Sequence, residues 1–318
     1  KPQKYPLHEP SIIYENDNGI LNNVSNKIAP ELEDFGIVNK IVTTDFDNDG
    51  WEDFIVVGEW THIGIFKNNE GVFKDISEKS DLNNLFGWWF NIQETDINND
   101  GLKDYIVGNI GSNIKFKTSA EKPLRIYADD FDNNGTHDLV LSYEYENKYV
   151  PLRGKECSTQ QMPFIAEKIP TFTEFANASL QDIYGEKINT SYMREVTDLK
   201  SYILINNGDS SFKKIKLPDL AQTIPILSSD VLDYNKDGYE DIIVSGNIYN
   251  TEVETPRLDN PFALVLLSNK KDGYYCLSPN TTGLYTKGNT KSIKILDEPK
   301  VLLIGNNNES IESFKINN

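Results

Sequence analysis

One short pattern occurs four times in this chain, and it limits what the chain can fold into more than any other feature. The copies read "DFDNDGWEDFIVVG" from Asp45, "DINNDGLKDYIVGN" from Asp96, "DFDNNGTHDLVLS" from Asp130 and "DYNKDGYEDIIVSGN" from Asp233. Each has Asp first, Asp or Asn third and fifth, Gly sixth and Asp ninth, and a short apolar run follows at once. Four copies with the same internal spacing indicate a repeat architecture.

The residue types in the pattern are those of a calcium-binding loop. Calcium takes about six to eight oxygen ligands, and side chains at alternate positions of a tight loop can supply them. Glycine at the sixth position permits a sharp turn, because it adopts positive φ at little cost. The seventh residue offers its carbonyl oxygen whatever its side chain is. Magnesium demands stricter octahedral geometry and keeps its waters, so we expect calcium, with up to four structural ions.

The candidate metal ligands are the residues at positions one, three, five, seven and nine of each copy. They are Asp45, Asp47, Asp49, Trp51 and Asp53 in the first, Asp96, Asn98, Asp100, Leu102 and Asp104 in the second, Asp130, Asp132, Asn134, Thr136 and Asp138 in the third, and Asp233, Asn235, Asp237, Tyr239 and Asp241 in the fourth. The third set is the weakest, because Asn134 is neutral.

An EF-hand is the nearest alternative, and the residues around the loops argue against it. An EF-hand needs a bidentate Glu at position twelve and a helix on either side. The chain has an aliphatic residue there in every copy, namely Val56, Val107, Leu141 and Val244. The flanking segments are rich in β-branched and aromatic residues, which is typical of strands. Each loop is therefore predicted to join two strands. An Asp/Asn-rich hairpin turn without metal is the other alternative.

The arrangement of strands predicts an all-β fold, namely a β-propeller with four-stranded blades. Residues 37–78 give the clearest blade, with the calcium loop between its first and second strands. Residues 292–316 form a degenerate last blade without a ligand cluster, and residues 11–25 have the pattern of two outer strands that would complete it and close the ring. We expect about five to seven blades. They would form a single domain over residues 1–318, which can be part of a longer chain.

One stretch breaks the repeat. The third and fourth copies begin 103 residues apart, against 51 for the first and second. Residues 156–186 have the pattern of a helical hairpin, because apolar residues recur at helical spacing. Thr171 and Glu174 form a capping-box pattern, and Gly185 fits a C-terminal stop. We expect this hairpin to be inserted in the third blade, where it either braces the propeller or provides a docking surface for a partner.

The loops and their trailing strands resemble the FG-GAP, or VCBS-type, repeat of integrin α-subunit propellers and many bacterial surface proteins. Phe35-Gly36 and Phe86-Gly87 each end nine residues before an Asp loop and match the "FG" half of that motif. The "GAP" half is replaced by Gly58-Glu59-Trp60, Gly108-Asn109 and Gly246-Asn247. The order of segments is most similar to the C-terminal portion of long VCBS-repeat proteins of Bacteroidota related to cartilage acidic protein. The resemblance implies the propeller fold and calcium, and it says little about the ligand.

Charge and composition restrict the partners. The formal net charge of −18 repels nucleic acid and anionic lipid, and it suits bound metal or cationic partners. No apolar run reaches the length of about 18–20 residues that a membrane helix needs, so any membrane association would pass through a partner or a lipid anchor outside this chain. The two cysteines, Cys157 and Cys276, could form one bridge, and their spacing does not decide this.

Catalytic motifs are missing from the sequence. The chain has three histidines and shows no nucleophile elbow, zinc-type histidine spacing or phosphate-binding glycine loop. Trp88 and Trp89 are adjacent in one predicted strand and must face opposite sides; they are either buried between blades or stack on a sugar at the rim. Arg125 and Arg153 either bind an anionic partner or form salt bridges.

The leading hypothesis is a non-catalytic, calcium-binding β-propeller that binds protein or glycan. Loops of this type in extracellular modules bind calcium weakly, with dissociation constants of about 10⁻⁴–10⁻³ M. We therefore expect a location at the cell surface or outside the cell, on the exterior of a bacterial outer membrane. The alternative is a polysaccharide lyase or glycoside hydrolase on the same scaffold. A third hypothesis makes the chain one subunit of a surface assembly.

Overall fold

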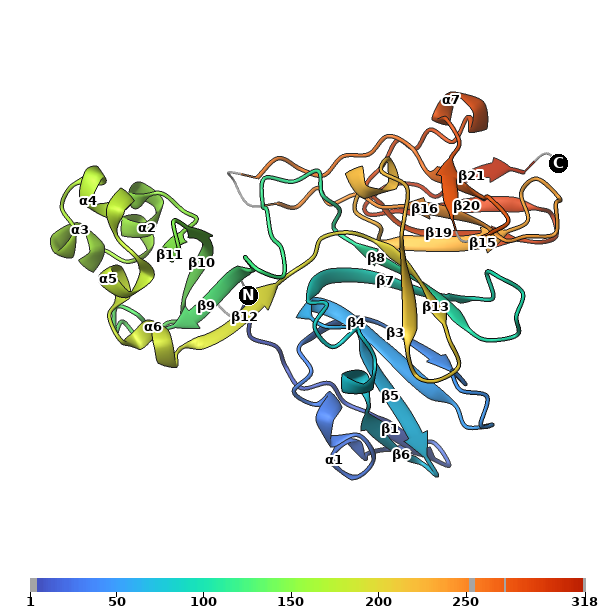
Figure 1. The fold of residues 1–318 in the computed structure, drawn as a ribbon, viewed down its shortest axis with the longest axis horizontal. Coiled ribbons are helices and arrows are strands. Elements are labelled where there is room, and N and C mark those ends of the chain that lie inside the picture. Colours follow the sequence, from blue (N-terminus) through green and yellow to red (C-terminus); the bar gives the residue numbers. More distant parts are fainter. Residues whose placement is uncertain (1–4, 252–254, 272, 317–318) are drawn as a thin grey trace.

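The computed structural model describes residues 5–251, 255–271 and 273–316, and antiparallel sheets dominate this part of the chain (Figure 1). The predicted all-β class is confirmed, with strands joined in meander order and a few short helices between them. Three groups of four strands follow chain order, as in a propeller blade, and the first two groups are joined by one strand pair into a single eight-stranded sheet. A group of three strands follows them. We call these four groups the blade-like sheets one to four.

Sheet one has the four strands that the sequence predicts over residues 37–78. It contains β3 (Ile37–Thr44), β4 (Asp53–Thr61), β5 (Gly64–Asn69) and β6 (Val72–Asp75). The first Asp loop, residues 45–53, joins β3 to β4. The β-branched and aromatic residues of β4 are buried on both faces of the sheet, which explains their continuous apolar run.

Sheet two is completed from a distant part of the chain. Its strands are β7 (Gly87–Thr95), β8 (Asp104–Asn109), β13 (Tyr202–Asn206) and β14 (Phe212–Lys216). Tyr202 pairs with Val107 across β13 and β8, so residues 110–201 are an insertion between the second and third strands of one sheet. The Gly111 N–H donates to the Leu199 carbonyl at 2.9 Å, so the two ends of this insertion, which we call the insert, lie next to each other.

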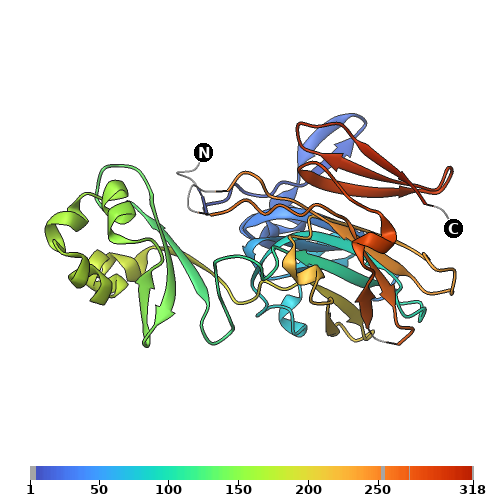
Figure 2. The same cartoon turned by 90° about the horizontal axis from the view of Figure 1, so that it is seen from above.

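The third repeat does not form a third blade, as was predicted, but lies within the insert. It holds a sheet of its own, in the order β11-β10-β9-β12, and it lies to one side of the other sheets (Figures 1 and 2). Its strands are β9 (Leu124–Asp129), β10 (Asp138–Tyr145), β11 (Lys148–Pro151) and β12 (Tyr192–Val196). Because β12 pairs with β9 rather than extending from β11, this inserted sheet does not have the strand order of a blade.

The helical segment is not the two-helix hairpin that was predicted. Five short helices occupy it: α2 (Lys155–Gln161), α3 (Phe164–Lys168), α4 (Phe172–Asn177), α5 (Leu180–Tyr184) and α6 (Lys187–Thr190). The capping box of Thr171 and Glu174 is present, and a second one begins at Ser179. This second cap and the break at Pro170 divide the apolar stripe into separate turns, which the helical spacing alone did not show.

Sheets three and four complete the series, and the described residues do not form a closed ring. Sheet three contains β15 (Ser228–Leu232), β16 (Asp241–Ser245), β17 (Leu264–Ser268) and β18 (Tyr274–Cys276). Sheet four has three strands, β19 (Thr290–Leu296), β20 (Val301–Asn306) and β21 (Glu312–Lys315). Among the described strands, the hairpin of β1 (Tyr14–Asp17) and β2 (Ile20–Asn23) pairs within itself, and it lies beside sheet one, with sheets two and three between it and sheet four (Figure 1). The predicted closure by the N-terminal strands is therefore wrong.

Consecutive blade-like sheets pack face against face, and alternate residues of one strand enter different cores. Tyr105 and Val107 pack toward sheet one, whereas Ile106 packs toward sheet three. Likewise, Ile242 packs toward sheet two and Ile243 toward sheet four. This face-to-face stacking is propeller-like. Each fully buried aliphatic side chain stabilises it by about 1.5–3 kcal/mol.

The remaining elements are short. They are α1 (Ser25–Ile28), α7 (Pro279–Thr282) and the 3-10 turns Pro30–Leu32, Ser77–Lys79 and Ala221–Thr223. Cys157 and Cys276 are not bridged to each other. Within the described part of the chain, none of the helices has the length and apolar character needed to cross a bilayer.

Candidate functional site

The four Asp loops, residues 45–53, 96–104, 130–138 and 233–241, share one backbone conformation. The glycine at position six has a φ between 85° and 88° in all four, as the sequence predicted. The residue at position four also has positive φ, which the sequence analysis missed; it is Asn48, Asn99, Asn133 or Lys236. Asn is the non-glycine residue that most easily adopts this conformation, so three Asn at position four were the available signal.

The first Asp of each loop organises the turn in the same way. Its two carboxylate oxygens accept the N–H groups of positions five and six. In the first loop the distances from Asp45 to Asp49 and Gly50 are both 3.0 Å. The same pairs occur at Asp96, Asp130 and Asp233, at 2.9–3.1 Å. The position-seven N–H donates to the position-five side chain in every loop, from Trp51, Leu102, Thr136 and Tyr239.

Acidic side chains converge most closely in the first and third loops. Oxygens of Asp45, Asp47 and Asp49 lie within 4.8 Å of one another, as do oxygens of Asp130, Asp132 and Asp138. In the second and fourth loops position three is an Asn, whose amide donates to the position-five Asp. The distances are 2.8 Å from Asn98 to Asp100 and 2.9 Å from Asn235 to Asp237. These oxygen-rich turns have the donor set that suits a hard cation.

The ninth Asp links each loop to the rest of its sheet. Asp53, Asp104 and Asp241 are buried, and one oxygen of each accepts an N–H from the loop's second residue. The other oxygen accepts the N–H of Asn68, Asn206 or Ser268, which lie in the last two residues of the third strand of sheets one, two and three. In the third loop, Asp138 instead meets the side chain of Gln161 from α2.

Burial affects the protonation of these ninth-position carboxyls. It raises the pKa of Asp53 and of Asp104 to about 6, although the N–H donors oppose the shift. Burial also raises the pKa of Asp138 and Asp241. A bound cation would favour the ionised form of the same groups, so metal and proton are expected to compete here.

Three of the loops gather at one end of the blade-like sheets. The Asn206 side chain donates to the Phe46 carbonyl at 2.7 Å, while its backbone N–H donates to Asp104, so it connects the first and second loops. The Asn99 amide lies 3.3 Å from the Gly238 carbonyl, which connects the second and fourth. The third loop belongs to the insert. Negative charge is therefore concentrated where strands one and two of neighbouring sheets turn.

Lysine side chains contact three of the loops. The Lys67 ammonium of β5 contacts both Asp47 and Asp49, the latter at 2.7 Å. Partial burial lowers its pKa, but the hydrogen bonds to the two carboxylates outweigh this and raise the pKa overall. Lys270 lies 3.3 Å from Asp237, and Lys187 contacts the Asp130 carbonyl. Lys67 and Lys270 thus contact carboxylates that a bound cation would also need, whereas Lys187 contacts a main-chain carbonyl.

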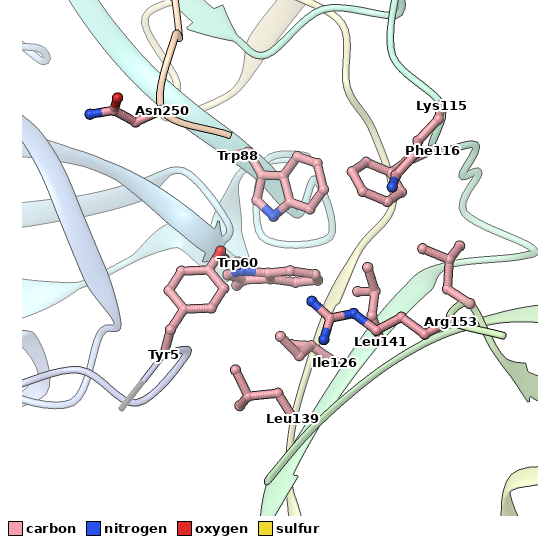
Figure 3. A pocket seen from close by; sticks show the side chains of 11 residues that line it. Tyr5, Trp60, Trp88, Lys115, Phe116, Ile126, Leu139, Leu141, Arg153 and Asn250 are labelled. Atoms are coloured by element: carbon pink, nitrogen blue, oxygen red, sulfur yellow. Dashed lines mark hydrogen bonds between the residues drawn. The ribbon is translucent and has the colours of Figure 1, made fainter. Parts of the chain in front are cut away.

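A second site lies between the insert and sheets one and two. We call this cavity of about 710 Å³ the junction pocket (Figure 3). Its lining consists of Tyr5, Trp60, Trp88, Lys115, Phe116, Ile126, Leu139, Leu141, Leu152, Arg153 and Asn250. Trp88 faces this pocket and Trp89 faces the core between sheets one and two, so the two adjacent indoles do point to opposite sides.

The sequence did not reveal the junction pocket. Its residues come from positions 5 to 250 and meet only because the insert folds back on sheets one and two. Arg153 lines the pocket. Arg125 forms an ion pair with Glu195 at 3.0 Å, which is the salt-bridge alternative given for it in the sequence analysis. Trp51, a predicted seventh-position ligand, is 47% exposed. Aromatic residues in the sequence gave candidates for the pocket but no way to choose among them.

A comparison with known protein families identifies the repeat type of the first two Asp loops. Residues 45–107 match the model of the FG-GAP-like repeat, so the chain carries that repeat over the first and second loops and the strands between them. No curated protein matches the chain. One solved structure, reported for recognition of non-reducing terminal N-acetylglucosamine by an Agrocybe aegerita lectin, aligns over 96% of this chain and 87% of its own, with 12% identity. Its TM-score is 0.21, and nothing further is inferred from that likeness.

Proposed function

We propose that this protein is a non-catalytic, calcium-stabilised, propeller-like scaffold that binds protein or glycan outside the cytoplasm. The observation that carries the proposal is the common geometry of the four Asp loops. In all four, the first Asp bridges the same two N–H groups, and the ninth is buried beneath the loop. The FG-GAP-like repeat match over residues 45–107 supports the scaffold role.

Calcium is favoured by the ligand chemistry. The converging groups are carboxylate and amide oxygens, which hard cations prefer, and the loops vary in charge in a way that calcium's flexible coordination tolerates. Without a cation, the carboxylates of one loop repel one another at close range. Four bound calcium ions would change the net charge from −18 to about −10. Each ion that binds only the folded state also stabilises that state by linkage.

The proposed location and kinship follow from the same loops. Extracellular calcium modules have dissociation constants of about 10⁻⁴–10⁻³ M, and only an environment rich in calcium would fill sites of that affinity. We place the protein at the cell surface or outside the cell, on the exterior of a bacterial outer membrane and within a surface assembly. The order of segments supports kinship with the C-terminal portion of VCBS-repeat proteins related to cartilage acidic protein.

The calcium role is tested by thermal unfolding and calorimetric titration of the whole chain. We expect saturating calcium to raise the melting temperature and magnesium to raise it less. Asp49→Ala should shrink the calcium-dependent shift, because it removes a carboxylate from the first loop. Asp219→Ala is the matched control, since Asp219 is exposed, lies outside the Asp loops and forms an ion pair with Lys216. An unchanged melting curve when wild-type protein is treated with a chelator would contradict the proposal.

The binding role is tested separately on a glycan array and a set of immobilised proteins, with and without calcium. We expect calcium-dependent retention and no chemical change in the retained molecule. New reducing ends or unsaturated sugars in the product would instead identify a glycoside hydrolase or a lyase. Native mass spectrometry of the protein purified from its own cells would show whether it belongs to a larger assembly.

A further inference from the structure

Sheet four has one strand fewer than the other blade-like sheets. Sheets one, two and three each end on a fourth strand, which is β6, β14 or β18, whereas sheet four ends on β21. Among the described residues, the outer edge of β21 has no partner strand. An exposed strand edge can pair with a strand of another chain.

The fourth strands of the other sheets fill the cores next to them. Phe73 of β6 packs against the cluster that contains Phe54. Phe212 of β14 lies in the core between sheets one and two, and Tyr274 of β18 packs against the core between sheets two and three. By the same rule, a fourth strand on sheet four would direct an apolar side chain toward sheet three.

The space for such a side chain is present as a cavity. It has a volume of about 230 Å³ and lies beside β21, between sheets three and four. Ile243 lines it from sheet three, Leu302 and Phe314 line it from sheet four, and Leu284 lines it from the segment that joins the two sheets. The same four residues belong to the core between these sheets or pack against it, so the cavity is a gap in that core.

The backbone of β21 offers the groups that a further strand needs. The Ile316 N–H donates to the Lys300 carbonyl at 3.1 Å, on the β20 side. In an antiparallel pair, alternate residues turn their backbone groups to the same edge, so Phe314 also faces β20, whereas Ser313 and Lys315 face the open edge. Both of these residues therefore present an N–H and a carbonyl group to an added strand.

The hairpin of β1 and β2 has the complementary properties. Every residue of its two strands is exposed, and Ile20 and Leu21 of β2 are 66% and 63% exposed. Such exposed apolar side chains on a strand with an open edge favour pairing with another sheet. Sheets two and three separate the hairpin from sheet four within one molecule (Figure 1). The hairpin of another molecule would therefore supply the added strand.

The distribution of charge favours a second copy of this chain as the partner. Residues 9–34, which include the hairpin, contain six acidic residues and one lysine. Residues 287–315, which include sheet four, contain five lysines and four acidic residues. Their net charge is thus +1, in a chain whose net charge is −18. An acidic hairpin from a second copy is therefore attracted to this part of the molecule rather than repelled by it.

We propose that β2 of a second copy pairs with the open edge of β21 as the fourth strand of sheet four, and that Ile20 or Leu21 fills the cavity. Because the hairpin and the edge are different surfaces, the copies join head to tail. The contact goes beyond the proposed function and does not depend on calcium, since neither strand belongs to an Asp loop. For so small an interface we expect a dissociation constant of about 10–100 µM.

The first test is sedimentation equilibrium of the full chain at about 1–500 µM, a range that brackets the expected dissociation constant. We expect the average mass to rise with concentration, both in calcium and in a chelator. The double variant Ile20→Ser, Leu21→Ser should weaken self-association at least about tenfold, because it removes the side chain that fills the cavity. Phe172→Ser is the matched control, since Phe172 is 70% exposed but lies on α4 of the insert. A wild-type chain that stays monomeric at every concentration would overturn the proposal.

The second test mixes two variants that each lack one side of the contact. Ser313→Pro removes an N–H from the open edge, and this N–H faces away from β20, so the existing strand pair is kept. Leu284→Trp blocks the same side by filling the cavity and does not alter β21. Far-ultraviolet circular dichroism checks that the variants are folded.

Either of these edge variants, and the double hairpin variant, should be monomeric alone. An equimolar mixture of an edge variant with the hairpin variant should form dimers and nothing larger, because one productive contact remains. A mixture that stays monomeric, or edge variants that associate as the wild type does, would refute the pairing of β2 with β21.

Discussion

The second Asp loop and the junction pocket both depend on sheet two, yet they are assembled in different ways. The loop is made of nine consecutive residues, and its turn is held by hydrogen bonds within residues 96–104. The pocket takes Trp88 from the same sheet and needs Tyr5, Phe116 and Arg153 from three other segments. The loop is acidic and exposed, whereas the pocket has a floor of aromatic and aliphatic side chains.

This difference separates two kinds of information in the chain. A site within one loop can be recognised from the spacing of its residues, because neighbouring residues on a tight turn lie close together. A site between the insert and the sheets cannot be recognised in this way, because its residues come together only when the insert packs against the sheets. Asp104 lies between these extremes: it belongs to a local pattern, but one of its oxygens accepts the N–H of Asn206, 102 residues away.

The largest expected effect comes from removing the insert. Residues 112–198 can be replaced by a short Gly/Ser linker, because Gly111 and Leu199 are hydrogen-bonded neighbours. We expect the calcium stoichiometry to fall from four to three, as measured by calorimetry. Far-ultraviolet circular dichroism should still report folded sheets. Loss of calcium binding at the remaining loops would show that these loops are not local units.

The next largest effect is expected for Asp104→Ala. The substitution leaves two buried N–H groups, of Ile97 and Asn206, without their acceptor, and should lower the free energy of unfolding by about 3 kcal/mol. Urea unfolding in the presence of a chelator measures this without a metal contribution. Asp100→Ala, at the exposed fifth position, should cost under about 1 kcal/mol. Equal losses for the two variants would contradict the linking role of the ninth Asp.

A smaller effect is expected from pH. In the metal-free protein the pKa of Asp104 is about 6, above its unfolded value, so the folded state binds this proton more tightly. The corresponding stabilisation is complete below about pH 4 and is lost as pH rises through 6. The difference in unfolding free energy between wild type and Asp104→Asn should therefore fall between pH 4 and 6. Calcium should reverse that trend, since it favours the ionised carboxylate. A difference in unfolding free energy that does not change with pH, with or without calcium, would contradict the raised pKa of Asp104.

The smallest expected effect is at Lys67. Its ammonium contacts Asp47 and Asp49, so Lys67→Ala should strengthen calcium binding at the first loop by about fivefold. Lys79→Ala serves as the control, because Lys79 is exposed and lies outside the loop. Calorimetric titration at low ionic strength would resolve the change. Weaker calcium binding in the Lys67 variant would mean that the lysine organises the loop instead of competing with the cation.

The predictability of this protein from its sequence follows the same division. The positive φ at Gly50 and the strands on either side of the first loop could be predicted, because both depend on nearest neighbours. The position of the third repeat could not, since β13 has the same apolar pattern whether it pairs with β8 or begins a new blade. The positive φ of Trp60, 61°, has no local sequence pattern either, so the position of its indole in the pocket could not be predicted.

The pairing of β8 with β13 also bears on how the chain is made. While the ribosome is still producing residues 110–201, one edge of β8 has no partner, because β13 has not yet been made. Long-range pairing of this kind raises contact order and slows folding. In newly made chains the edge of β8 should therefore stay unpaired until β13 has been made, and a chaperone that shields exposed strands would bind there.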